Sequence, residues 1–206
     1  MLRWTASVVV ALLVAATASS AQEHLTEAKA SFIFNGERIQ ISRGNPDAAR
    51  FVAKFAAADG GCGAPCIAPM QAAVGVRTLD EIQVLDFLMT EVAGNTGLMV
   101  DARGPQARAQ GFIPGTVSLP HHTVASGNPF QQDILRALGA RAFDGVYNFT
   151  DARALLVYDG GPSSNDAGLL VQNLLDVGYP VEMIQYYRGG MQVWSVLGFS
   201  IESGQS

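Results

Sequence analysis

The fold is decided by residues 154–198, which read ALLVYDGGPSSNDAGLLVQNLLDVGYPVEMIQYYRGGMQVWSVLG. The stretch begins with an apolar run at residues 154–158 and then meets a Gly-rich turn at residues 159–163. A helical pattern follows from about residue 164 to residue 177, and a second apolar run occupies residues 181–186. Strand, Gly-rich turn, helix and strand in this order predict one βαβ unit.

The turn of this unit is the place where a site is expected. It lies at the carboxyl edge of a parallel sheet and at the amino end of a helix. Backbone N–H groups there point at whatever is bound, and the helix dipole favours an anion. The candidate site is therefore the loop made of Asp159, Gly160, Gly161, Pro162, Ser163 and Ser164.

Composition indicates one ordinary globular domain with room for a small appendage. The chain has 206 residues, of which 49% are hydrophobic and only 15% are charged, enough to bury a sizeable core. The net charge is −5, and Lys and Arg are scattered without a basic run. This charge distribution argues against a nucleic-acid partner.

The first residues have the pattern of a secretory signal peptide. Arg3 supplies the positive charge, residues 6–16 form the apolar region, and small residues precede a cleavage site after Ala21. The apolar region is shorter than the ~20 residues that a membrane span needs, so we expect cleavage rather than an uncleaved anchor. No later apolar run is long enough to span a membrane. We therefore expect a periplasmic or secreted protein in an oxidising compartment.

Residues 22–72 are expected to form a small hairpin-plus-helix appendage. Asn35 and Gly36 lie between two apolar runs, which is the strongest short-range signal for a β-hairpin. Asn45 is suited to cap a helix that has Pro46 at its first position.

The appendage contains the only two cysteines of the chain, Cys62 and Cys66. After export, two nearby thiols most often form a structural disulfide. A redox-active dithiol stays open as an alternative, although three residues separate the cysteines and the thioredoxin-type motif has two. A copper or zinc site completed by Met70 or His121 also stays open. No cofactor and no metal site is assigned.

The main domain, residues 73–206, alternates short helices and strands. Thr78 and Glu81 have the spacing of a capping box and predict the start of a helix with apolar residues as far as Val92. A short buried strand is then expected over residues 97–101. This alternation is typical of an α/β fold.

Asp101 and Arg103 end that buried strand with a charged pair. Both side chains can turn toward one face of the sheet, where they would tie neighbouring loops together. A short helix at residues 105–110 and a strand at residues 116–119 are expected to follow.

The remaining segments complete the pattern. His121 and His122 are adjacent, and we expect them to face solvent or cap an element rather than bind metal. Residues 130–140 are expected to be helical, residues 141–151 to be a packed loop, and residues 191–197 to be the last helix. The alternation predicts a central, mainly parallel sheet that is covered on both faces.

Four motifs follow one another along this domain: Asp101-Ala102-Arg103, then Gly111-Phe112-Ile113-Pro114-Gly115, then the strand and loop at Tyr158, and last Arg188-Gly189-Gly190 with Trp194 and Gly198. Their order resembles that of a rhodanese-like domain, the sulfurtransferase fold, over residues 74–201. The resemblance implies a three-layer α/β fold around the parallel sheet. The chain is also similar to exported bacterial rhodanese-like proteins, in which a Cys-Pro-Pro-Phe-Cys-like segment precedes the domain. In this resemblance the first motif matches the family's Asp-x-Arg, the second its Gly-His-Ile-Pro-Gly, and the last its Gly-Gly…Trp…Gly ending.

The loop departs from the family at its reactive position. The resemblance implies a nucleophilic Cys directly after the strand that ends at Tyr158, and here that position is Asp159. Sulfur transfer needs a thiolate that holds a sulfane sulfur as a persulfide, which a carboxylate cannot carry. A phosphatase of the related cell-cycle type needs the same Cys. Phe112 in place of the family's His is expected to affect packing only.

Three hypotheses follow from these observations. The first is a catalytically silent rhodanese-like domain that acts as an exported binding or regulatory module. Its unknown protein or small-molecule partner would meet Asp159 and the loop amides. The second is a thiol redox or sulfur-relay protein that uses Cys62 and Cys66. The third is a protein that binds copper or zinc through the same two cysteines.

Overall fold

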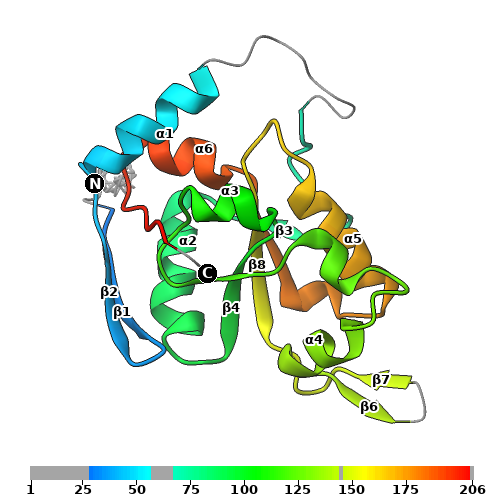
Figure 1. Cartoon of the computed structure of the whole chain (residues 1–206). Helices are drawn as coiled ribbons and strands as arrows, with labels where there is room; N and C mark the ends of the chain where they lie inside the picture. Colours follow the sequence, from blue (N-terminus) through cyan, green and yellow to red (C-terminus); the bar gives the residue numbers. More distant parts are fainter. Residues whose placement is uncertain (1–27, 57–66, 144–145, 205–206) are drawn as a thin grey trace, which may run out of the picture.

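The computed structural model of the chain describes residues 28–56, 67–143 and 146–204 (Figure 1). Its centre is a five-stranded sheet with the order β3-β9-β8-β4-β5, in which all neighbouring strands are parallel. β8 is the middle strand, so the loop that follows it leaves from the centre of the sheet. The strands are β3 (Arg77–Thr78), β9 (Ile184–Tyr187), β8 (Ala154–Tyr158), β4 (Gly97–Asp101) and β5 (Thr116–Ser118).

Helices cover both faces of the sheet, as predicted. α2 (Glu81–Phe87), the π-helical turn η1 (Leu88–Val92) and α6 (Gly190–Val196) pack in one core. The other core contains α5 (Asp166–Asp176), α4 (Gln131–Ala137) and the 3₁₀ turn η2 (His121–Val124). The short helix α3 (Pro105–Ala109) follows β4 at the carboxyl edge of the sheet.

The middle strand shows why the sheet has two cores. Leu156 and Tyr158 point into the core with α2 and α6, whereas Leu155 and Val157 point into the core with α5. All four side chains are fully buried. Alternation with a period of two places successive side chains on opposite faces, and burial on both faces explains the continuous apolar run.

The appendage packs into the core of the main domain. It consists of the hairpin β1 (Ala30–Phe34) and β2 (Glu37–Ile41), followed by α1 (Pro46–Ala56). Asn35 and Gly36 have positive φ angles at the hairpin turn, as predicted. α1 lies beside α6 (Figure 1), and Phe32 and Phe51 are buried in the core that contains Trp194.

Three sequence expectations need correction. The capping box of α2 is made by Asp80 and Gln83 and not by Thr78 and Glu81: Asp80 Oδ1 accepts from Gln83 N at 2.9 Å, and Gln83 Oε1 accepts from Asp80 N at 3.1 Å. Thr78 pairs with Tyr186 in the sheet, so its backbone belongs to a strand and is not available as a cap.

The segment at residues 141–151 was expected to be a loop but contains a second hairpin, β6 (Arg141–Phe143) and β7 (Val146–Asn148). Its strands have only three residues each, too few for a clear alternating pattern. The strand expected from residue 181 begins at Ile184 instead. The 3₁₀ turn η3 (Val181–Met183) precedes it, because the carbonyl of Pro180 accepts from Met183 N at 3.0 Å.

Among the described residues, no helix is both long and apolar enough to cross a membrane.

Candidate functional site

The 159–164 loop connects β8 to α5 and is held by the start of α6. The carbonyl of Asp159 accepts from Met191 N at 3.0 Å, and the carbonyl of Gly160 accepts from Gln192 N at 3.0 Å. These two contacts tie the loop carbonyls to α6. Gly190 makes the close approach possible: its φ is +52°, and a Cβ there would lie 2.5 Å from the Asp159 carbonyl oxygen.

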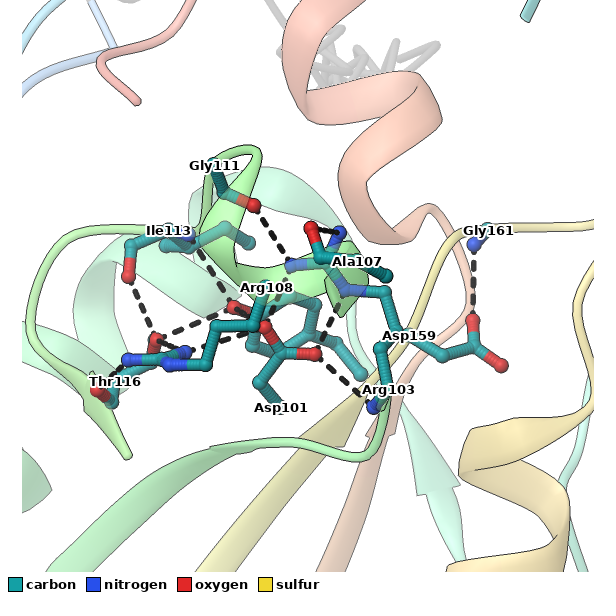
Figure 2. A network of polar contacts seen from close by, with 10 residues as sticks. Asp101, Arg103, Ala107, Arg108, Gly111, Ile113, Thr116, Asp159 and Gly161 are labelled. Carbon is teal, nitrogen blue, oxygen red and sulfur yellow. Dashed lines mark hydrogen bonds and ion pairs between the residues drawn. The ribbon is translucent and has the colours of Figure 1, made fainter. Parts of the chain in front are cut away.

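The Asp159 carboxylate accepts hydrogen bonds from backbone N–H groups of the loop and of α5. One carboxylate oxygen accepts from Gly161 N at 2.9 Å (Figure 2), and the other accepts from Ala167 N at 2.9 Å in the first turn of α5. The side chain is fully buried. The carboxylate therefore takes up both of these N–H groups and lies at the amino end of a helix, where the dipole favours a negative charge. The Asp159 carboxylate itself is turned inward and is not presented to a partner.

Burial and hydrogen bonding shift the pKa of this carboxyl group in opposite directions. Burial raises the pKa of Asp159, and the N–H groups of Ala167 and Gly161 lower it, with burial the larger effect. The folded chain therefore holds this proton more tightly than the unfolded chain does.

A pH dependence follows from the raised pKa of Asp159. The contribution of this carboxyl group to stability is fully present below the pKa that it has in the unfolded chain. It is lost as the pH rises through the higher pKa that it has in the folded chain. We expect the unfolding free energy of the wild type, measured relative to Asp159→Asn, to fall as the pH rises across this window. Urea unfolding of both proteins between about pH 3 and pH 7 measures this difference, because the other carboxyl groups titrate alike in both. A difference that stays flat or rises with pH contradicts the expectation.

Asp101 and Arg103 form a buried ion pair, and the structure adds partners to it (Figure 2). The Asp101 carboxylate accepts from Arg103 Nε at 2.8 Å and Arg103 Nη2 at 2.6 Å. It also accepts from Arg108 Nη1 at 3.2 Å and from the Tyr158 hydroxyl at 3.0 Å. Burial and the negative charge of Asp101 raise the pKa of Tyr158, so this phenol remains a donor.

Arg108 also belongs to this network, although no motif in the sequence marks it. It is buried in a five-residue helix, where its Nη2 donates to the Thr116 carbonyl at 2.7 Å. Its guanidinium lies 3.9 Å from the centre of the Phe112 ring. Phe112 therefore has a packing role, as expected, and its ring packs against the Arg108 guanidinium. The network joins β4, β5, β8 and α3, and so ties the carboxyl ends of β4 and β8 to the amino end of β5.

A segment of the appendage also reaches the candidate loop. Ala68 N donates to the Pro162 carbonyl at 2.7 Å, and the Ala68 carbonyl accepts from Arg188 Nε at 2.9 Å. In the sequence, Arg188 stands out only as part of a motif, and nothing indicates that residues 67–70 contact the loop. Long-range contacts between main-chain groups leave no pattern in the sequence. Within the loop, Ser163 is exposed, and Pro162 and Ser164 are half-buried.

The other candidate ligands do not form a metal centre in the part of the chain that the structure describes. His121 Nε2 lies 3.9 Å from Asp166 Oδ1, and both side chains are about one-third exposed. No group of three or more His, Cys, Asp or Glu side chains suited to a metal occurs among the described residues. Met70 is exposed. Cys62 and Cys66 lie outside the described residues.

Comparison with known proteins places most of this architecture in one family. The family model described as Rhodanese-like domain matches residues 86–197, more than half of the chain. No curated protein matches the chain significantly in sequence.

Solved structures with a related fold share little sequence with the chain. A Rhodopseudomonas palustris protein of unknown function, described as a possible tyrosine phosphatase, is 20% identical with a TM-score of 0.44, and the match covers 64% of this chain and 88% of that one. A human single-domain sulfurtransferase is 20% identical with a TM-score of 0.40, covering 59% and 96% of the two chains. The rhodanese-like domain of an Anabaena protein is 18% identical with a TM-score of 0.39, covering 59% and 76%.

Proposed function

This chain belongs to the rhodanese-like domain family, and we propose that it is a catalytically silent member, exported and acting as a binding or regulatory module. The observation that supports silence is the position of Asp159. Its carboxylate takes the Gly161 and Ala167 N–H groups, which lie where a bound anion would be held. The loop therefore has neither a thiol to carry sulfur nor free amides at that position to stabilise a persulfide.

The buried Asp159 also bears on how a partner would bind. Because this carboxylate is buried and hydrogen-bonded through both oxygens, the proposed protein or small-molecule partner would contact the outer surface of the loop. Ser163 is exposed there, and the partly exposed His121 and Asp166 offer a mixed polar edge close to the start of α5. Export rests on the signal-peptide pattern of the first 21 residues.

A sulfurtransferase assay with thiosulfate and cyanide tests this proposal. We expect no thiocyanate from the wild type and measurable thiocyanate from Asp159→Cys. The introduced thiolate would accept the Gly161 and Ala167 N–H groups, which lower a thiol pKa and favour the nucleophile. Asp133→Cys is the matched control, because Asp133 is exposed on α4 and accepts from the exposed Arg136 guanidinium instead of from buried backbone N–H groups.

The results separate the proposal from its alternative. Turnover by the wild type contradicts silence. If that turnover disappears in Cys62→Ser/Cys66→Ser, the two cysteines are the active pair and the protein performs thiol chemistry. The contact of Ala68 with Pro162 favours this as the second candidate function, because Ala68 follows Cys66 by two residues.

A further inference from the structure

Residues 67–70 lie against the candidate loop and are held by hydrogen bonds to their main-chain groups. Ala68 is buried and bonds on both sides, to the Pro162 carbonyl at 2.7 Å and to Arg188 Nε at 2.9 Å. The Thr78 hydroxyl donates to the carbonyl of Met70, which fixes the other end of the segment to β3. Three separate parts of the fold, the loop, the turn after β9 and the end of β3, thus hold these four residues.

Side-chain burial does not explain why this segment stays in place. Ile67 is 66% exposed and Met70 is 65% exposed, so their burial contributes little to holding the segment. Burial of the small Ala68 side chain adds only a little. The hydrogen bonds of the segment's main-chain groups, two of them donated by the side chains of Arg188 and Thr78, are therefore the main attachment that the structure shows.

The loop is held from two directions. On one side, the N–H groups of Met191 and Gln192 in α6 donate to the carbonyls of Asp159 and Gly160. On the other side, Ala68 N donates to the carbonyl of Pro162. With three of its carbonyls fixed, the loop cannot move away from the side chain at position 159 unless one of these contacts breaks. The contact with Ala68 is the one made by a segment outside the matched domain.

We propose that residues 67–70 are a clamp that keeps the 159–164 loop closed around the side chain at position 159 and slows the access of small reagents to it. The proposal deepens the proposed function, because it takes this loop as the site of the silent domain. In this assignment Ala68 and Arg188 are positioning residues. Release of the clamp opens the loop to a small oxyanion or electrophile.

Alkylation of a single introduced thiol measures whether the loop is closed. The starting protein is Asp159→Cys with Cys62→Ser and Cys66→Ser, and the measurement is its rate of reaction with iodoacetamide. Ala68→Pro removes the N–H donor to Pro162, and Arg188→Leu removes the donor to the Ala68 carbonyl. Loss of one hydrogen bond of about average strength raises the open population by roughly fivefold, so we expect each variant to react about fivefold faster.

Two controls keep the outcome specific to the clamp. Ile67→Ala changes an exposed side chain of the same segment and should leave the rate unchanged. Arg188→Lys keeps a donor and a positive charge, and should restore slow reaction relative to Arg188→Leu. Amide hydrogen exchange of Gly161 and Ala167 in the wild-type chain, compared with Arg188→Leu, reads the same opening without any introduced thiol and should also accelerate about fivefold.

The proposal is overturned if Ala68→Pro and Arg188→Leu leave both the alkylation rate and the exchange rate unchanged. It is equally overturned if the starting protein reacts as fast as the exposed thiol of Asp133→Cys placed in the same Cys62→Ser/Cys66→Ser background. Neither result depends on turnover of thiosulfate by the wild type. Failure of the clamp and failure of the silent assignment are therefore distinguishable.

Discussion

Asp101→Ala is expected to lower the free energy of unfolding by about 3–5 kcal/mol, measured by urea denaturation at neutral pH. The Asp101 carboxylate is fully buried and accepts four hydrogen bonds from the side chains of Arg103, Arg108 and Tyr158. Its removal leaves two buried guanidinium groups without their counter-charge. Breaking a buried ion pair from one side is costly for this reason, because the remaining charge is neither paired nor hydrated.

The matched control is Asp133→Ala, which removes another Asp–Arg pair. Asp133 and Arg136 lie 3.1 Å apart on α4, and their side chains are 74% and 60% exposed. An exposed pair contributes little, so we expect a change below about 0.5 kcal/mol. Asp101→Asn is a milder variant that keeps the shape and can be measured if the alanine variant does not fold. Equal costs for Asp101→Ala and Asp133→Ala would show that the network does not stabilise the sheet edge.

Gly190→Ala is expected to cost about 2–5 kcal/mol, the sum of left-handed backbone strain and steric overlap. The φ of Gly190 is +52°, and a Cβ there would lie 2.5 Å from both the Asp159 carbonyl oxygen and Gly161 N. All the nearest atoms are backbone, so no side chain can rotate out of the way. The 159–164 loop must move, and the contacts that α6 makes to its carbonyls are lost with it. Urea denaturation measures the change.

Gly36→Ala separates the two causes of that cost. Gly36 also has a positive φ, +82°, but beyond its chain neighbours no atom lies within 4 Å of the place that a Cβ would take. We therefore expect only the conformational strain, about 1–2 kcal/mol. The excess cost of Gly190→Ala over Gly36→Ala isolates the steric contact with the loop. If the two variants are equally stable, the close approach of Gly190 to Asp159 is not what holds the loop.

The periodic segments and the special residues at their ends could be predicted from the sequence. The apolar run at β8 has the right length and neighbours for a buried parallel strand, and Asn35-Gly36 marks a hairpin turn through its backbone preference. The cap of α2 was misplaced by two residues because Thr78 and Asp80 both suit a cap. Pairing of Thr78 with Tyr186 in the sheet decides between them, and that pairing joins residues that are far apart in the chain.

For the candidate loop too, some features follow from the sequence and others depend on long-range contacts. The absence of a thiol at residue 159 is a fact of the sequence, and the position of the loop follows from the order of strand, turn and helix. The direction of the Asp159 side chain does not follow. It depends on two N–H groups, one from the loop and one from α5, which come within 2.9 Å of its oxygens only in the folded chain.

The sequence by itself determined the α/β architecture, the place of the candidate loop and the absence of a thiol in that loop, because local periodicity, turn chemistry and residue identity are properties of short segments. Only the tertiary structure decided that the Asp159 carboxylate is buried and bound by two backbone N–H groups, that Arg108 joins the Asp101 network and that Ala68 binds the loop. These contacts join residues distant in the chain, and hydrogen bonds between them depend on distances and directions that packing alone sets.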